Sequence, residues 1–378
     1  MKVIIAPDKF KGSLSALQVC KAIERGIRQI LPQIEIISHP LGDGGEGSLD
    51  ILADHLSLIK KKLTVCDPLS RPIETYYYHD KNSAYIEMAA QSGLMLLKKE
   101  EQNVMKTTTL GTGEVIADAI KAGCTNIYLM IGGSATNDGG TGILQALGYE
   151  FKDEKGAKLI PIGENLSKIR SVEYPGRIDM INEITFNIIC DVKNPFYGPY
   201  GAAKVYGKQK GIISEEDIDL LDCGLENFAK LIQRETGIDL NKVECSGAAG
   251  GVGGGLFALL NSKILPGTQT IMQLTGFAEK SRGADLVITG EGKVDSQTLS
   301  GKVVYGVTEY CTDQRLAVGI LCGISETDHF EQYATVYGPY PIKKAAISTD
   351  KAISEAAQLL TERTAELLSD FISDQKGR

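Results

Sequence analysis

The stretch that decides the fold is KVIIAPDKFKGSLSALQVCKAIERGIRQILPQIEIIS, residues 2–38. Its apolar start, residues 2–6, predicts a buried strand. Apolar residues then recur every three or four positions, as on one face of a helix, and Ser15 with Gln18 matches a capping box. A second apolar run follows at residues 34–38. A strand, a helix and a strand in this order predict a parallel sheet covered by helices.

Both ends of the chain show this alternation of strands and helices, whereas the middle has a more mixed pattern of predicted elements. Residues 284–289 and 317–322 predict strands, and residues 351–372 predict a long amphipathic helix. In the middle, the Tyr-rich residues 73–79 and 84–89 alternate in polarity and predict an antiparallel hairpin. We therefore expect a Rossmann-like three-layer α/β/α core domain and an inserted second domain of mixed α/β structure.

The domain boundaries follow from where the texture changes. We place the core domain at residues 1–60 and 282–378 and the inserted domain at residues 61–281.

The 378 residues are 43% hydrophobic and 23% charged, as in ordinary globular proteins. The net charge of −8 gives no indication of nucleic acid or an anionic membrane as a partner.

Further exclusions concern the membrane and the redox compartment. No apolar run approaches the ~20 residues that span a bilayer, and the N-terminus is charged too early for a signal peptide. The eight cysteines form no C-x-x-C motif, and several lie within apolar patterns. We therefore expect a cytoplasmic protein without disulfides or zinc.

The 42 glycines gather in islands at predicted strand ends. GDGGEG (Gly42–Gly47) and GGSATNDGG (Gly132–Gly140) each follow a strand and begin a helix, and GEGKVDSQTLSGK (Gly290–Lys302) lies between a strand and a helix. Asp191 directly follows a strand at residues 186–190. Because ligands of open α/β sheets bind beyond the carboxyl ends of the strands, we expect these loops to face a functional crevice.

The composition of the islands favours phosphoryl transfer. Glycine lets main-chain N–H groups approach phosphate oxygens, and a helix N-terminus adds partial positive charge. The same islands carry carboxylates, which fit beside phosphate when Mg²⁺ lies between them or when one acts as a general base. As an alternative, Asp43 and Asp138 are helix N-caps without catalysis. For the island Ser246–Leu256, a ligand contact, close helix packing and a hinge all remain open.

Taken together, the islands resemble the glycerate kinase family. The resemblance rests on APDKFKGSLSA, GDGGEG, TLGTGE, GGSATNDGG, GAAGG and GEGKVDSQTLSGK, in this order from Ala6 to Lys302. One departure is Lys9, which stands where the family commonly has serine. If that residue contacts a ligand, the affinity for substrate differs here. If it lies in a surface turn, nothing changes.

The resemblance implies ATP-dependent phosphorylation of D-glycerate with Mg²⁺, in a two-domain fold. We favour 2-phosphoglycerate as the product, and 3-phosphoglycerate remains open. The expected mechanism is in-line transfer in a cleft between the two domains, whose closure excludes water. The expected partners are therefore D-glycerate and ATP, with no nucleic acid or membrane. The oligomeric state is open, a homodimer being one alternative.

The expected site residues combine the islands with the resemblance. For catalysis we select Asp295, Asp191, Asp43, Lys11 and Lys293. For the nucleotide we select Gly132, Gly133, Ser134, Thr136, Asn137, Asp138, Gly139, Gly290 and Glu291. The expected metal ligands are Asp191 and Asp138. Asp295 is the first candidate for the general base, although the sequence leaves open which acid has which role.

Two other classes of function compete with a kinase. A Rossmann-like NAD(P)-dependent oxidoreductase of small hydroxy acids needs a glycine fingerprint after the first strand, which APDKFKGS does not supply. A non-catalytic sensor of sugar acids would use the same anion-binding loops. It would not need so many carboxylates around them, and it would not consume ATP.

Overall fold

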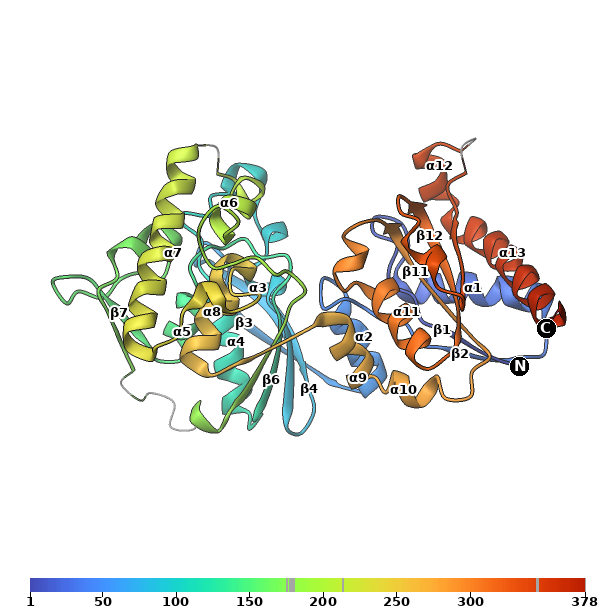
Figure 1. Ribbon diagram of the computed structural model, residues 1–378. Helices are drawn as coiled ribbons and strands as arrows, with labels where there is room; N and C mark the ends of the chain where they lie inside the picture. Colours follow the sequence, from blue (N-terminus) through green and yellow to red (C-terminus); the bar gives the residue numbers. More distant parts are fainter. Residues whose placement is uncertain (175, 177–180, 213, 345–346, 378) are drawn as a thin grey trace. The chain divides into compact units, whose positions relative to one another are not determined.

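The computed structural model describes residues 1–174, 176, 181–212, 214–344 and 347–377. The chain forms two compact units, and the first contains both chain ends (Figure 1). Unit 1 is Met1–Asp43 with Pro266–Arg378, and unit 2 is Gly44–Leu265. Each unit has its own sheet and its own apolar core, which confirms the α/β fold class predicted from the sequence.

The sheet of unit 1 is parallel and five-stranded, in the order β13-β12-β11-β1-β2. Its strands are β1 (Lys2–Ile5), β2 (Glu35–Ser38), β11 (Leu286–Val294), β12 (Ala317–Ser325) and β13 (Val336–Pro341). β1 lies near the centre, where Ile5 pairs with Ile288 on one side and Ser38 on the other. The apolar run of β1 is buried because strands flank it on both sides and helices cover the sheet.

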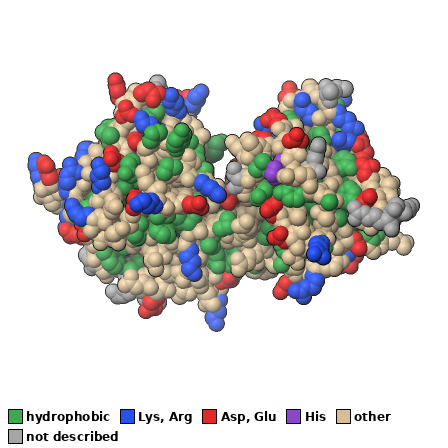
Figure 2. All heavy atoms as spheres, in the orientation of Figure 1, with side chains coloured by type: hydrophobic (Ala, Val, Ile, Leu, Met, Phe, Trp, Pro, Cys, Tyr) green, Lys and Arg blue, Asp and Glu red, His purple; other side chains and the backbone are tan. Residues whose placement is uncertain are grey.

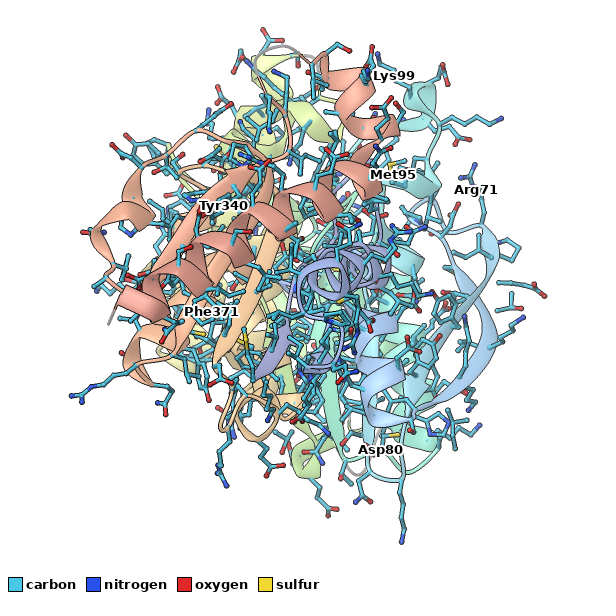
Figure 3. All side chains as sticks on the ribbon, turned by 90° about the vertical axis from the view of Figure 1, so that its right-hand side faces the viewer. Arg71, Asp80, Met95, Lys99, Tyr340 and Phe371 are labelled. Atoms are coloured by element: carbon cyan, nitrogen blue, oxygen red, sulfur yellow. The ribbon has the colours of Figure 1, made fainter. Side chains whose placement is uncertain are left out.

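Helices cover both faces of this sheet. They are α1 (Ala16–Ile30), α9 (Gly267–Leu274), α10 (Phe277–Lys280), α11 (Val303–Asp313), α12 (Thr349–Ser354) and α13 (Ala356–Gly377). α1 packs against α13 over one face, and α11 contacts β11 and β12 on the other. Figure 3 shows Tyr340 and Phe371 on the α13 side, where the Tyr340 hydroxyl donates to Asp370. The predicted capping box of α1 is present, with Ser15 and Gln18 bonded reciprocally.

The sequence was wrong about where β11 ends. It predicted a loop from Gly290, but β11 continues to Val294 and pairs with β12 beyond that point, Glu291 opposite Cys322. A Cβ atom on Gly290 would lie 2.3 Å from the carbonyl oxygen of Leu321. Glycine here therefore permits two strands to pack closely, whereas the sequence alone suggested a turn.

The sheet of unit 2 is mixed and six-stranded, in the order β10-β9-β6-β5-β4-β3. Its strands are β3 (Ile59–Cys66), β4 (Pro72–His79), β5 (Ser83–Glu87), β6 (Asn126–Met130), β9 (Thr185–Ile189) and β10 (Lys263–Leu265). β4 and β5 form the predicted antiparallel hairpin, whereas β5, β6, β9 and β10 are parallel. A separate ribbon pairs β7 (Glu150–Lys152) with β8 (Ser171–Glu173).

The helices of unit 2 bury apolar stripes against this sheet and each other. They are α2 (Ser48–Leu56), α3 (Ala89–Ser92), α4 (Leu110–Lys121), α5 (Thr141–Ala146), α6 (Ala202–Tyr206), α7 (Glu215–Thr236) and α8 (Ala248–Leu260). α7 is the longest helix of this unit, and it buries Leu221, Leu225 and Phe228. Among the described residues, no helix is both long enough and apolar enough to cross a bilayer.

The boundaries between the two units lie at other residues than the sequence suggested. The structure divides the chain at 43/44 and 265/266, whereas the sequence texture placed the changes at 60/61 and 281/282. Residues 44–60 join unit 2 because α2 contacts β5 there, and Asp50 accepts a hydrogen bond from the Tyr78 hydroxyl. α9 joins unit 1 because it contacts α11.

On the face drawn in Figure 2, Lys and Arg are interspersed with Asp and Glu over both units.

Candidate active site

The candidate active site of unit 1 lies at the carboxyl edge of the five-stranded sheet. β1 leads to β2 on one side, whereas β11 leads to β12 and β13 on the other, so the connections diverge between β1 and β11. Ligands of open α/β sheets bind outside the strand ends at such a switch point. The Asp8 N–H donates to the Gly290 carbonyl oxygen over 2.8 Å, which holds the two segments together at this edge.

Asp8 is a buried carboxyl at this edge that the sequence prediction did not include. It is 8% exposed, and its Oδ1 accepts a hydrogen bond from the Lys9 N–H at 2.6 Å. Burial and the Asp43 carboxylate raise the pKa of Asp8 to about 7, against the opposing effect of Lys9. The Lys9 ammonium is therefore close enough to act on this acid. A pKa near neutrality is typical of functional acids.

Glu291 is a second acid with a raised pKa. It projects from β11, is 4% exposed, and accepts a hydrogen bond from the Thr298 hydroxyl at 2.5 Å. Burial raises the pKa of Glu291 to about 7, although the Thr298 bond and the Lys302 charge oppose the shift and Asp43 adds to it. Asp8 and Glu291 are thus two carboxyls that change protonation near pH 7 and share Asp43 as a neighbour.

Asp295 differs from these two acids in its electrostatics. Burial acts to raise its pKa, but the Gln297 N–H, Lys293 and Lys302 outweigh that effect and hold the pKa below its usual value. Lys293 Nζ lies 3.3 Å from Asp295 and 2.8 Å from Glu326. Asp295 is therefore an ionised carboxylate, and the Lys293 ammonium already bridges two acids.

The remaining cations of this edge have different surroundings. Lys11 is exposed, and it has no hydrogen bond or ion pair to any residue that the structure describes. Lys302 acts on both Glu291 and Asp295. Sequence reasoning did not single out Lys302, although it ends the quoted island. Gly290, predicted for the nucleotide, lies within the strand and contributes through backbone packing.

In unit 2, the glycine loop and Asp191 lie at one edge of the six-stranded sheet. The loop follows β6, Asp191 follows β9, and these two parallel strands are neighbours. Gly132 and Gly133 are exposed. The rest of the predicted nucleotide loop is buried, namely Ser134, Thr136, Asn137, Asp138 and Gly139. The part of this loop that is open to a ligand is therefore its first turn.

Asp138 organises the loop from inside. It is fully buried, and its Oδ2 accepts hydrogen bonds from the Thr109 N–H, the Thr109 hydroxyl and the Gly142 N–H. Its Oδ1 accepts from the Gly140 N–H. The N-cap residue of α5 is Gly140, so Asp138 is not itself the N-cap. With both oxygens occupied by donors around the start of α5, Asp138 nevertheless fits a structural role better than the expected role as a metal ligand.

Lys210 supports the same loop and was not identified from the sequence. It is 5% exposed, and its Nζ donates to Ser134 Oγ at 2.8 Å and to the Thr136 carbonyl oxygen at 2.7 Å. Burial lowers the pKa of Lys210 to about 7, although Asp138 opposes this shift. In sequence, Lys210 lies in KQKG, which carries no motif that would signal burial.

The glycine-rich island Ser246–Leu256 packs against the loop rather than standing open. A Cβ atom on Gly250 would lie 2.1 Å from the Thr136 carbonyl oxygen, and one on Gly255 would lie 2.0 Å from that of Gly139. The buried Thr136 Oγ1 has no hydrogen-bond partner among the described residues. Of the alternatives left open by the sequence, close packing therefore describes the glycines of α8 best.

Unit 1 offers two carboxylates to a magnesium ion carried by a nucleotide. Among the described residues, no group of three or more His, Cys, Asp or Glu is arranged to hold a metal. Mg²⁺ in phosphoryl-transfer sites commonly takes one or two carboxylates and completes its shell with phosphates and water. Asp43 and the ionised Asp295 are oxygen ligands of that kind, and both act on Glu291.

Comparison with known proteins agrees with the chemistry of this edge. The family model described as the glycerate kinase family matches residues 3–372. A Bacillus subtilis (strain 168) protein named glycerate kinase is 38% identical over 368 residues, which cover 97% of this chain and 96% of that protein. An Escherichia coli (strain K12) protein named glycerate 2-kinase is 39% identical over 309 residues, 81% of each chain.

A solved structure extends the agreement to the fold. The crystal structure of a Salmonella typhimurium LT2 protein assigned as glycerate kinase 2 superposes with a TM-score of 0.86 at 36% sequence identity. The alignment covers 100% of this chain and 99% of that one. The strand-end acids, the family model and the shared fold lead to one conclusion: this chain belongs to the glycerate kinase family, a family of phosphotransferases.

Proposed function

We propose that this chain transfers the γ-phosphoryl group of ATP to the 2-hydroxyl of D-glycerate and forms 2-phosphoglycerate. The observation that carries the proposal is the cluster of Asp8, Asp43, Glu291 and Asp295 at one strand edge. Family membership supports glycerate as the acceptor, and the name of the Escherichia coli relative supports the 2-position. Transfer to the 3-hydroxyl is the alternative outcome of the test below.

Glu291 is the proposed general base. A base works best when its pKa lies near the operating pH, because it is then ionised often enough and still basic enough to take a proton. The pKa of Glu291, about 7, meets this condition, whereas the pKa of Asp295 is lowered. We therefore move the base from Asp295, the first candidate from the sequence, to Glu291. Asp8 is close enough to Glu291 for the charges of the two carboxylates to act on each other.

Asp43 and Asp295 are the proposed ligands of Mg²⁺. When bound with ATP, the ion would neutralise charge on the phosphates during transfer. Lys293 and Lys302 hold Asp295 in its ionised form, which is the form that a cation needs. Gly290 supports the site by keeping β11 close to β12, so that Glu291 projects from a rigid strand.

For unit 2 we propose an anion site at the first turn of the glycine loop. The exposed Gly132 and Gly133 would offer main-chain N–H groups, and Lys210 adds positive charge from beneath the loop when it is protonated. Ser134, Thr136, Asn137, Asp138 and Gly139 would act as the scaffold of that turn. Asp191 remains the proposed carboxylate of this edge, as a metal ligand or a polar contact.

The test is phosphorus NMR of purified protein with D-glycerate, ATP and Mg²⁺. A new phosphomonoester signal that is a doublet in the proton-coupled spectrum indicates the 2-position, because C2 carries one proton. A triplet indicates the 3-position, because C3 carries two. ATP that remains intact with D-glycerate contradicts the proposal and favours a sensor. Reduction of NAD(P) by D-glycerate would favour the oxidoreductase.

A further inference from the structure

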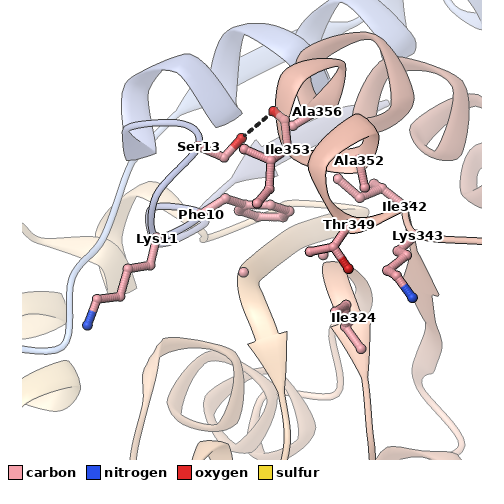
Figure 4. Close-up of a pocket in the computed structure, with 12 residues that line it drawn as sticks. Phe10, Lys11, Ser13, Ile324, Ile342, Lys343, Thr349, Ala352, Ile353 and Ala356 are labelled. Carbon is pink, nitrogen blue, oxygen red and sulfur yellow. Dashed lines mark hydrogen bonds between the residues drawn. The ribbon is translucent and has the colours of Figure 1, made fainter. Parts of the chain in front are cut away.

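A cavity in unit 1 lies beside the strand-end acids, and no step of the proposed reaction uses it. Its volume is about 180 Å³, and it lies at the carboxyl ends of β11 and β12 under α12 (Figure 4). Gly292 and Gly323 form part of its wall, and Gly292 directly follows Glu291. Phe10, two residues after Asp8, also lines the cavity, and its backbone lies next to Gly292.

The cavity is mostly apolar. Figure 4 shows the Phe10 ring facing a group of aliphatic side chains from β12, the segment after β13, α12 and the start of α13. These side chains are Ile324, Ile342, Ala352, Ile353 and Ala356. Ile353 is 44% exposed, so the apolar surface continues to the rim. Ser13 donates to the Ile353 carbonyl oxygen at 2.9 Å, which ties the loop after β1 to α12.

Two lysines mark the rim. Lys11 and Lys343 both border the cavity, and neither has an ion pair with any residue that the structure describes. Lys293, by contrast, is engaged by Asp295 and Glu326. An apolar pocket with unpaired ammonium groups at its mouth is complementary to a molecule with a flat apolar part and an anionic part.

We propose that this cavity binds the base of an adenine nucleotide, with the phosphates running past Lys11 toward Glu291 and Asp295. The inference rests on the proposed kinase function and adds the place of its nucleotide. Pockets for whole drug-sized ligands occupy about 300–1,000 Å³, so about 180 Å³ suits a single ring system with the ribose and phosphates outside. Phe10 supplies an aromatic contact of the kind that bases make.

D-glycerate is a poor match for the same cavity. It carries a carboxylate and two hydroxyls on three carbons, and these groups need several hydrogen-bond donors when they leave water. Of the lining side chains, Ser13 and Thr349 are the uncharged polar ones, and Ser13 already donates to Ile353. Burial of a base, in contrast, removes apolar surface from water on both partners.

The experiment fills the cavity and compares ligands with and without a base. Ala352 is 6% exposed and points into the cavity, so Ala352→Phe would occupy the space of the base. Calorimetry measures the Kd of MgADP and of magnesium pyrophosphate for both proteins. We expect a rise of about 10–100-fold in the Kd of MgADP, the range typical of losing one base contact, and no change for pyrophosphate.

The matched control is Ala278→Phe in another cavity of the same unit. That cavity, of about 360 Å³, is bordered by Gln269, Phe277 and Tyr310, and it lies on α9, α10 and α11. The control should leave the Kd of MgADP unchanged. Should Ala352→Phe fail to fold by circular dichroism, Thr349→Phe at the exposed rim replaces it, because it blocks entry without filling the core.

The outcomes separate this inference from the proposed function. An unchanged Kd of MgADP in folded Ala352→Phe or Thr349→Phe overturns the base pocket, as does equal weakening of MgADP and pyrophosphate. If wild-type protein phosphorylates D-glycerate while that result holds, the kinase proposal stands and the pocket alone is rejected. If MgADP binding depends on the cavity but D-glycerate is never phosphorylated, the pocket stands and the acceptor is wrong.

Discussion

The Thr298 hydroxyl donates to Glu291 Oε1 over 2.5 Å, inside the turn that follows β11. This bond favours the ionised form of Glu291 and so limits how far burial raises its pKa. Thr298→Val removes the hydroxyl and keeps the shape. We expect the acid limb of the kcat/KM profile to move to higher pH, with little change in the plateau above it. A profile that stays in place would contradict the assignment of Glu291 as the titrating base.

Removal of the base itself should have a larger effect. Glu291→Gln keeps an acceptor for Thr298 but cannot take a proton. We expect kcat to fall by about 10²–10⁴-fold and the inflection near pH 7 to disappear. Glu279→Gln, an exposed acid of α10 in the same unit, is the control and should behave as wild type. If Glu291→Gln keeps the inflection, Asp8 is the group that titrates.

Asp8 should make the protein less stable as the pH rises from about 4 to 7. Its pKa is raised in the folded state, so the folded protein holds a proton in this window that the unfolded chain has already lost. The free energy of unfolding therefore falls with pH, and Asp8→Asn should flatten this dependence by roughly 4 kcal/mol. Urea midpoints from pH 4 to pH 8 measure the slope, and Asp328→Asn, an exposed acid of unit 1, is the control.

Lys210 should make the free energy of unfolding rise with pH, opposite to the effect of Asp8 and at higher pH. Its pKa is lowered to about 7 in the folded state, so between pH 7 and about 10 the unfolded chain binds a proton that the folded protein lacks. Stability should therefore rise with pH in this window, and Lys210→Met should remove the rise. Lys208→Met is the matched control, because Lys208 is exposed and paired with Glu215. Identical pH slopes for wild type and Lys210→Met would show that the ammonium is solvated.

Asp138→Ala should destabilise unit 2 without a direct effect on ligand binding. Removal of the carboxylate leaves four buried donor bonds unmade, at Thr109, Gly140 and Gly142. We expect the free energy of unfolding to fall by about 3 kcal/mol. Hydrogen exchange of α5 amides locates the loss, and Glu154→Ala in an exposed turn serves as control. Unchanged exchange, together with a loss of Mg²⁺ affinity, would restore Asp138 as a metal ligand.

The sequence determined the local elements and the position of the islands within them. The helix of α1 with its capping box, the hairpin of β4 and β5, and the strands of the parallel sheet all follow from periodicity and end signals. These features depend on residues that are close together in the chain. The motif order from Ala6 to Lys302 likewise identified the family, which the comparisons then showed.

Only the tertiary structure decided which groups act on each other and which are buried. Asp8, Asp43 and Glu291 come together because β1 lies between β2 and β11, although up to 283 positions separate these residues in the chain. Lys210 and Asp138 are buried by segments distant in sequence, which is why neither their burial nor their partners could be inferred from their neighbours. A pKa depends on desolvation and on charges in space, so the choice of Glu291 over Asp295 as the proposed base required the fold.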